Sequence, residues 1–366
     1  MTARDALFEL RDLRKYFPVK RGLVFDRTVA QIKAVDGVSF TIRGGEAFGL
    51  VGESGCGKST IGRCLLKLEE PTGGQILFED ADIATFDGRQ TQAFRRHVQA
   101  VFQDPFSSLN PRMTVEEIVG EPLLVHGIEP DRVGRLQRVR ELLSVCGLPA
   151  RLVDRYPHEM SGGQRQRVGI ARALALRPDF IVCDEAVSAL DVSIQAQIVR
   201  LLEDLREQFG LTYLFIGHDL SVVRHICQRV AVMYLGRIVE IADCDTLFDD
   251  ARHPYTRALL ASVPVPDPEI ERRREHQVIQ GEIPSPMNPP SGCAFHPRCP
   301  LADETCRVAV PALQAVGDDH YAACPKVGEA SPDPAWVAGV TGMNAMRPST
   351  AQDEDQSSCH HDFPSS

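Results

Sequence analysis

Residues 52–60 read GESGCGKST and fit the pattern G-x-x-x-x-G-K-[ST]. In loops of this type, backbone N–H groups surround phosphate oxygens, the lysine contacts the terminal phosphates and the following hydroxyl binds Mg²⁺. An apolar run from Ala47 to Val51 precedes the loop, and a helix-like stretch from Ser59 to Leu68 follows it, so a helix N-terminus adds its own attraction for anions. The pattern predicts a nucleotide site. Its expected binding residues are Gly52, Glu53, Ser54, Gly55, Cys56, Gly57, Lys58, Ser59 and Thr60.

Two acidic residues follow another apolar run, Phe180 to Cys183, which is short enough to be a buried parallel strand. Asp184 and Glu185 are therefore expected at the carboxyl end of that strand, where ligands of open α/β sheets bind. At a phosphate site the first carboxylate holds Mg²⁺ and the second polarises the attacking water. The alternative is a solvated acidic loop.

Gln103 and His218 each end a strand-like run, Ala100 to Phe102 and Tyr213 to Gly217. The glutamine amide can bind Mg²⁺ or orient water, and the histidine can be a catalytic group. Taken alone, a loop glutamine is solvated and a histidine is a structural hydrogen-bonding residue. Beside a phosphate loop both become candidates for the site.

The segment Met160–Arg167 reads MSGGQRQR and opens a helix-like stretch. A serine and two glycines at a helix start offer free N–H groups and a positive dipole end to an anion. A simple N-cap with a glycine turn is the alternative. The candidate residues are Ser161, Gly162, Gly163 and Gln164.

This set of motifs, in this order, resembles the ATP-binding cassette (ABC) ATPases over roughly Leu7 to Val263. The resemblance implies ATP and Mg²⁺ as ligands. It makes Gln103 the Q-loop residue, Glu185 the catalytic base and His218 the switch histidine. It also assigns Mg²⁺ to Ser59, Gln103 and Asp184, which are the Walker A serine, the Q-loop glutamine and the Walker B aspartate.

The same resemblance assigns two further elements of the nucleotide site. Ser188–Asp191 looks like the D-loop, which brings in Asp191, and an aromatic residue upstream of Walker A stacks on adenine. Phe17 is favoured by spacing over Tyr16, and core packing is the alternative for either. Met160 replaces the usual leucine, a volume-conserving change. Ala186 replaces the usual proline, which frees the backbone next to Glu185.

The chain has one Walker A motif and one signature segment. In the family, the signature of one cassette completes the nucleotide site of a second, facing cassette. The resemblance therefore implies a dimer, either with a second copy or with a homologous ATPase.

Two C-terminal segments, His253–Leu259 and Gly292–Pro300, resemble the extension of the oligopeptide and dipeptide permease ATPases. Residues 101–105 and 108–115 favour the second-ATPase type of that group. The extension contains four cysteines without a C-x-x-C pair, so spacing leaves zinc, an iron–sulfur cluster or unligated thiols open. The resemblance implies a four-iron four-sulfur cluster. Its expected ligands are Cys293, Cys299, Cys306 and Cys324.

Composition restricts the remaining functions. The formal charge of −10 argues against a nucleic-acid-binding surface. No apolar run approaches the roughly 18 residues of a membrane-spanning helix, and residues 1–5 have no apolar leader. Eleven cysteines without a leader indicate free thiols or metal ligands in a reducing compartment.

We therefore expect an α/β fold: an ABC ATPase domain at residues 1–255, with a parallel core, an antiparallel β edge and an inserted helical subdomain at about 104–160. The cysteine-containing extension is expected at 256–325. Residues 326–366 are rich in Ser, Pro and Asp and are expected to be a disordered tail. In the family the helical subdomain receives the membrane subunit, and Phe106 and Met113 suit such a docking groove, with packing in a small core as the alternative.

The expected function is that of the ATP-hydrolysing subunit of an ABC importer on the cytoplasmic face of the inner membrane. The implied partners are two permease subunits and, through them, a solute-binding protein. Peptides are the expected cargo. The alternatives are nickel or another cargo, a soluble ABC ATPase outside transport, and a partner subunit that binds but does not hydrolyse nucleotide.

Overall fold

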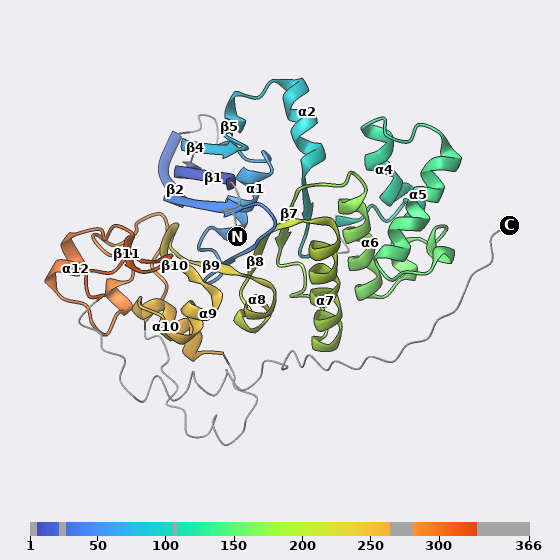
Figure 1. Ribbon diagram of the computed structural model, residues 1–366. Coiled ribbons are helices and arrows are strands. Elements are labelled where there is room, and N and C mark those ends of the chain that lie inside the picture. The colour runs from blue at the N-terminus through green and yellow to red at the C-terminus, as the bar shows by residue number, and fades with distance from the viewer. Residues whose placement is uncertain (1–5, 22–26, 105–107, 264–280, 328–366) are drawn as a thin grey trace, which may run out of the picture.

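The computed structural model describes residues 6–21, 27–104, 108–263 and 281–327. Phe106 and most of the expected tail lie outside these ranges. The described strands form two sheets (Figure 1). No helix in these ranges is both long enough and apolar enough to cross a membrane.

The central sheet has eight strands in the order β11-β12-β10-β9-β3-β8-β7-β6. Pairing is parallel from β9 to β6 and antiparallel from β9 to β11. The strands are β3 (Ala47–Val51), β6 (Val98–Val101), β7 (Phe180–Asp184), β8 (Thr212–Gly217), β9 (Arg229–Tyr234), β10 (Arg237–Asp243), β11 (Gln314–Gly317) and β12 (His320–Ala322).

The parallel strands are apolar throughout because both faces of the sheet are covered. Alternate residues of β7 enter different apolar clusters: Phe180 and Val182 face the antiparallel sheet and α1, whereas Ile181 and Cys183 join the cluster that contains the helical subdomain. The strands expected from the sequence therefore form, and their carboxyl ends meet at one edge.

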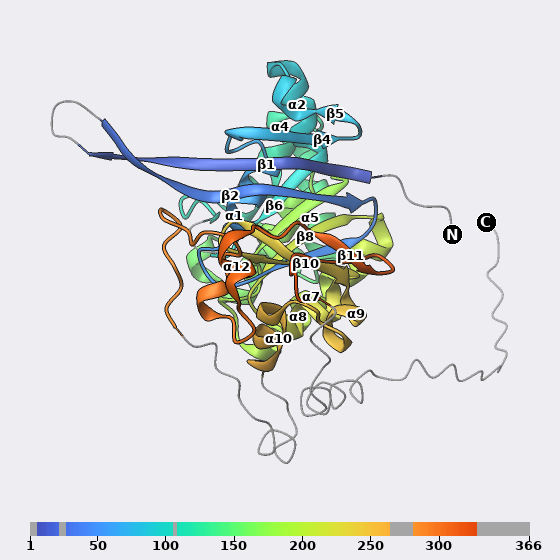
Figure 2. The same ribbon diagram turned by 90° about the vertical axis from the view of Figure 1, so that its left-hand side faces the viewer.

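The second sheet is antiparallel, with the strand order β2-β1-β4-β5. Figure 2 shows β1 and β2 as a long hairpin that extends beyond the rest of the molecule. Its strands are β1 (Ala6–Arg21), β2 (Arg27–Arg43), β4 (Gly73–Phe78) and β5 (Ala81–Asp82).

Helices α4, α5 and α6 pack against one another between β6 and β7 in the chain and lie together at one end of the molecule (Figure 1). Met113 is partly buried against the large apolar cluster, which supports the core-packing alternative for this residue. The described helices are α1 (Lys58–Leu65), α2 (Gly88–His97), α4 (Val115–Val125), α5 (Arg132–Val145), α6 (Gly162–Leu174), α7 (Val192–Phe209), α8 (Leu220–Ile226), α9 (Cys244–Asp249), α10 (Pro254–Ala261) and α12 (Glu304–Val308).

The C-terminal segment is built onto the cassette. Strand β12 pairs with β10 and so continues the central sheet. The buried Glu240 carboxylate of β10 accepts hydrogen bonds from His320 Nε2 at 2.8 Å and from the backbone N–H of His253 at 2.9 Å. Phe295 is 1% exposed and joins the large apolar cluster, so the extension uses the core of the cassette in place of a large core of its own.

Candidate active site

The phosphate loop connects β3 to α1, and its two ends are packed tightly against other backbone. Gly52 has φ 148° and Gly57 has φ 112°. A Cβ atom on Gly52 would lie 2.1 Å from the carbonyl oxygen of Met233, and one on Gly57 would lie 2.0 Å from that of Ala34. Only glycine fits at these two positions, so β9 and β2 fix the shape of the loop from both sides.

Lys58 lies inside this loop and is 5% exposed. Its Nζ donates to the carbonyl oxygens of Gly52 at 2.7 Å and Glu53 at 2.9 Å. No side chain caps the N-terminus of α1. The loop thus combines an ammonium group with an open helix N-terminus, a combination that binds phosphate.

Ser59 and Asp184 are brought together from α1 and β7, and Ser59 Oγ donates to Asp184 Oδ1 at 2.9 Å. Burial raises the pKa of the Asp184 carboxyl group. A buried carboxylate beside a hydroxyl offers hard oxygen ligands whose charge a cation would offset, so this pair fits Mg²⁺.

Glu185 lies at the centre of a second contact group. Gln103 Nε2 donates to Glu185 Oε2 at 2.6 Å, and His218 Nδ1 lies 3.6 Å from Glu185 Oε1. These residues come from the ends of β6, β7 and β8. The contact that Gln103 makes is with the expected base, so its role as a Mg²⁺ ligand stays a prediction.

A cavity of about 50 Å³ lies beside Glu185 and His218. One buried water needs roughly 10–15 Å³ of such space. The cavity is therefore large enough for a water molecule between a candidate base and a candidate phosphate contact.

The backbone at Glu185 is held despite the alanine that follows it. Glu185 has φ 48°, its N–H donates to Ile216 O at 2.9 Å, and its carbonyl oxygen accepts from Ser188 N at 3.1 Å and Ser188 Oγ at 3.0 Å. Ala186 is 1% exposed. These hydrogen bonds thus restrain the backbone of Glu185, although alanine replaces the usual proline at the next position, 186.

The segment 161–164 lies apart from this centre. Ser161 caps α6: its Oγ accepts from Gln164 N at 3.3 Å, and Gln164 Oε1 accepts from Ser161 N at 3.0 Å. In the described part of the chain, no hydrogen bond or ion pair joins Ser161–Gln164 to the phosphate loop, and Figure 1 draws α6 with α4 and α5, away from α1. Both Ser161 and Asp191 are exposed.

The two candidate adenine-stacking residues differ in their contacts. The Tyr16 hydroxyl donates to Asp36, whose other carboxylate oxygen accepts from Arg237 at 2.6 Å. The Phe17 ring has Lys15 Nζ 4.8 Å from its centroid. The choice of Phe17 over Tyr16 stays a prediction.

The four cysteines of the extension lie near one another. Burial, with smaller contributions from the nearby thiols of Cys293, Cys299 and Cys306, raises the pKa of Cys324 to about 11. Within the described ranges, however, no three His, Cys, Asp or Glu side chains are arranged to hold a metal ion. The residues supply the ligand type but not the geometry, so the iron–sulfur cluster expected on them is not supported.

Two contacts to the phosphate loop were missed by sequence reasoning. Arg298 forms an ion pair with Glu53 at 2.8 Å, and the Tyr255 hydroxyl accepts from the Glu53 N–H at 2.9 Å. Their only signal in the sequence was their place in the two C-terminal segments, 253–259 and 292–300.

Comparisons with known families match both parts of the chain. A family model described as ABC transporter matches residues 35–188, and one described as the C-terminal region of oligopeptide/dipeptide transporters matches residues 239–306. The oligopeptide transport ATP-binding protein AppF of Bacillus subtilis (strain 168) is 53% identical over 327 residues, which cover 88% of this chain and 99% of AppF. A putative peptide import ATP-binding protein of Brucella ovis is 54% identical over 318 residues, with coverage of 87% and 97%.

Solved structures match the cassette. The dimeric, post-hydrolysis ATP-binding cassette MJ0796 bound to ADP and Pi aligns with a TM-score of 0.56 and 30% identity, covering 65% of this chain and 98% of that one. The protein cbiO1 of Clostridium perfringens, part of the ABC transporter complex cbiONQ, aligns with a TM-score of 0.58 and 26% identity, covering 68% and 92%. The α/β cassette fold expected from the sequence is confirmed.

Proposed function

Since this chain belongs to the ATP-binding subunits of ABC transporters in the oligopeptide/dipeptide family, we propose that it couples ATP hydrolysis to the import of peptides across a membrane. The main structural support for ATP hydrolysis is that two pairs of contacting side chains lie at the same edge of the central sheet. Ser59 with Asp184 forms one group, at 2.9 Å, and Gln103 with Glu185 forms the other, at 2.6 Å.

Each side chain has a defined task in hydrolysis. The glycine loop and Lys58 bind the phosphates of ATP, while Ser59 and Asp184 hold Mg²⁺. When bound, the metal offsets phosphate charge. Glu185 orients water in the adjacent cavity and accepts its proton, and His218, beside Glu185, contacts the terminal phosphate.

Hydrolysis takes place in a dimer, formed with a second copy or with a homologous ATPase subunit. The exposed Ser161 and Asp191 lie on a part of the chain that makes no described contact with its own phosphate loop. They are available to the nucleotide site of a facing cassette. Closure on ATP and reopening after hydrolysis supply the motion that transport uses.

The cassette works on the cytoplasmic face of the cell membrane with two permease subunits, and a solute-binding protein delivers cargo to them from outside. The names of AppF and of the Brucella ovis protein, oligopeptide transport and peptide import, support peptides as cargo. The negative charge agrees with a function that does not involve nucleic acid. The proposed function includes no cluster on the four extension cysteines, because the described residues lack the arrangement of a metal site.

Uptake of a labelled tripeptide tests the proposal in cells that carry the chain with its transporter partners. Lys58→Ala removes the ammonium from the phosphate loop and is expected to lower uptake at least about tenfold. Arg89→Ala, at an exposed position on α2, is the matched control and keeps wild-type uptake. If cells with Lys58→Ala keep peptide uptake but lose nickel uptake, measured in parallel, peptide is not the cargo.

A further inference from the structure

The phosphate loop is anchored from outside the cassette core at one residue, Glu53. We propose that Arg298 of the C-terminal extension, together with Tyr255, is a positioning residue for ATP hydrolysis. It holds Glu53 so that the loop keeps its nucleotide-binding shape and no free carboxylate faces the phosphates. This inference rests on ATP binding by the loop.

The side-chain contact has two parallel hydrogen bonds. Arg298 Nη1 donates to Glu53 Oε2 at 2.8 Å, and Nη2 donates to Oε1 at 3.1 Å. The Arg298 side chain is 6% exposed and that of Glu53 is 21% exposed. The pair raises the pKa of Arg298 above its ordinary value. A paired guanidinium–carboxylate fork fixes both position and orientation, which a lysine cannot reproduce.

The backbone of Glu53 is held at the same time. Its N–H donates to Tyr255 Oη at 2.9 Å, and its carbonyl oxygen accepts from Lys58 Nζ at 2.9 Å and from Cys56 N at 3.3 Å. Glu53 therefore connects two residues that follow the cassette sheet in the chain, Tyr255 and Arg298, with the lysine that contacts phosphate.

The middle of the loop is held on both sides, at Glu53 and at Cys56. Cys56 is buried, and its carbonyl oxygen accepts from Gly236 N at 2.9 Å. Gly52 and Gly57 are fixed by close backbone packing, but Ser54 and Gly55 are exposed, and a Cβ on Gly55 would meet no atom within 4 Å. Since packing does not define Ser54 and Gly55, the contacts of Glu53 on one side and of Cys56 on the other set their position.

The extension that presents Arg298 is itself well anchored. Phe295, whose carbonyl oxygen accepts from Arg298 N at 2.9 Å, packs with its ring centroid 5.3 Å from those of both Tyr234 and Tyr255. Arg298 Nη1 also lies 3.3 Å from the Tyr234 hydroxyl. The guanidinium is therefore placed by the aromatic cluster and not by a flexible arm.

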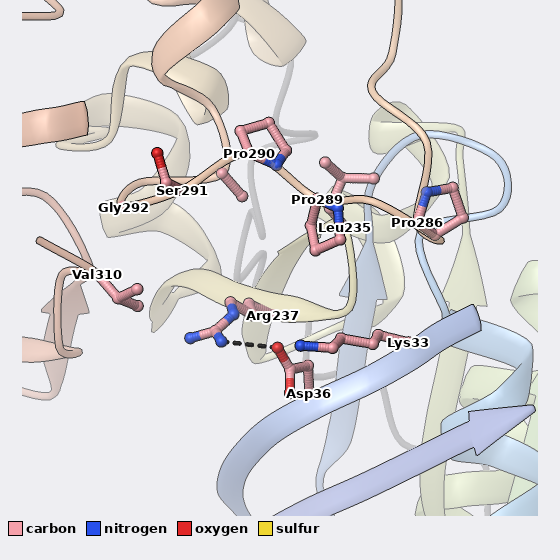
Figure 3. A pocket seen from close by; sticks show the side chains of 11 residues that line it. Lys33, Asp36, Leu235, Arg237, Pro286, Pro289, Pro290, Ser291, Gly292 and Val310 are labelled. Atoms are coloured by element: carbon pink, nitrogen blue, oxygen red, sulfur yellow. Dashed lines mark hydrogen bonds and ion pairs between the residues drawn. The ribbon is translucent and has the colours of Figure 1, made fainter. Parts of the chain in front are cut away.

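The extension also contacts β2, which packs against the other end of the loop at Gly57. Lys33 N donates to Pro286 O at 3.3 Å. Figure 3 shows Pro286, Pro289 and Pro290 across a cavity of about 220 Å³ from the Asp36–Arg237 pair. The extension thus touches elements on both sides of the phosphate loop.

The Arg298–Glu53 pair also neutralises the charge of the Glu53 carboxylate, which packing alone would not do. Without Arg298, a carboxylate within the phosphate loop would stand unpaired beside the most anionic part of ATP, and like charges at short range weaken binding. Removing the Glu53 charge as well should relieve that repulsion. This rescue separates positioning and charge pairing from a general loss of stability.

The test measures MgATP affinity with a fluorescent ATP analogue, together with kcat and KM. Arg298→Ala is expected to raise both Kd and KM about 10- to 100-fold with a smaller change in kcat, because a buried partner of a charge pair is lost. The double variant Glu53→Gln/Arg298→Ala is expected to recover to within about threefold of Glu53→Gln alone. Arg307→Ala, at an exposed arginine of the same extension that pairs with Glu304, is the matched control and keeps wild-type values.

Melting temperatures show whether each variant is folded, and MgATP affinity is also measured as a function of ionic strength. If Arg298→Ala fails to fold, Arg298→Gln replaces it, because glutamine removes the charge but keeps a long polar side chain. Its loss of affinity should weaken as salt rises, since screening reduces the carboxylate–phosphate repulsion. An unchanged Kd in either variant overturns the inference, and so does a double variant that binds MgATP no better than Arg298→Ala. Failure of the wild-type chain to bind MgATP would instead overturn the nucleotide site itself.

Discussion

Asp184 and Glu185 are adjacent in the chain, but the structure gives them different surroundings. Asp184 lies at the end of β7 beside Ser59, and burial raises its pKa. Glu185 has left the strand, with φ 48°, and contacts Gln103 and His218. Two carboxylates in different environments can take different roles, one as a metal ligand and the other as a base.

At this scale the first prediction concerns Glu185→Gln. The amide keeps the size of the side chain but cannot accept a proton, so we expect ATP hydrolysis to fall by about 10²- to 10³-fold. ATP binding and ATP-dependent dimerisation should be kept. Phosphate release measures hydrolysis, and light scattering in the presence of ATP measures dimerisation. Glu207→Gln, at an exposed position on α7, serves as control. Wild-type hydrolysis in Glu185→Gln would remove this residue from the role of base.

At the scale of elements, α10 shows how the extension is fixed to the cassette. His253 is buried at its start, where Nδ1 accepts from Tyr255 N at 3.0 Å and the backbone N–H of His253 donates to Glu240. Burial lowers the pKa of His253 to about 4; Glu240 opposes this shift and Arg257 adds to it. The cap of α10 therefore requires a neutral imidazole. Tyr255, which contacts the phosphate loop, lies two residues further along the chain.

This pKa predicts acid sensitivity. An unfolded histidine, with its pKa near 6.5, binds a proton more readily than the folded one, so its contribution to stability is complete above pH 6.5 and is lost as the pH falls towards 4. Between pH 7 and pH 5 the loss should be roughly 2 kcal/mol of unfolding free energy. Urea titrations at the two pH values measure it.

His253→Asn provides the comparison, because its side-chain oxygen can still cap α10 but does not titrate. The difference in unfolding free energy between pH 7 and pH 5 should shrink in this variant, and it should persist in His225→Asn, which changes an exposed histidine on α8. An equal pH dependence in His253→Asn and the wild type would show that His253 is not the group responsible.

At the scale of the whole molecule, we propose that the nucleotide site is divided between two cassettes. Lys58, Ser59, Asp184 and Glu185 converge within one chain, whereas Ser161 lies on α6 with the helical subdomain. In the proposed dimer, each chain therefore contributes its phosphate loop to one nucleotide site and its signature segment to the other.

Mixing two inactive variants tests this division. Lys58→Ala damages the phosphate loop, and Ser161→Arg places a bulky cation at the signature turn. Each variant alone should be inactive, but a mixed dimer of two copies contains one site with both halves intact. With random pairing, the mixture should recover about a quarter of wild-type ATPase activity. No recovery on mixing would contradict a site shared between two copies of this chain, and full activity of Ser161→Arg alone would contradict a shared site altogether.

Much of the active centre was predictable because its motifs are local. The residues at the ends of β3, β7 and β8 follow short apolar runs that are typical of buried parallel strands, and the carboxyl ends of such strands meet at one edge. The assignment of Gln103 to this centre depended on resemblance. Its contact with Glu185 is visible only in the structure, because the two residues lie on different strands.

The amino-acid sequence alone predicted which residues would bind phosphate, metal and water, since backbone freedom, charge and strand periodicity are properties of short segments. Tertiary structure decided how the extension meets the cassette: β12 extends the sheet at β10, and Arg298 reaches Glu53 across 245 positions of the chain. Contacts of this kind depend on the packing of distant segments against a shared core, and no spacing within either segment encodes them.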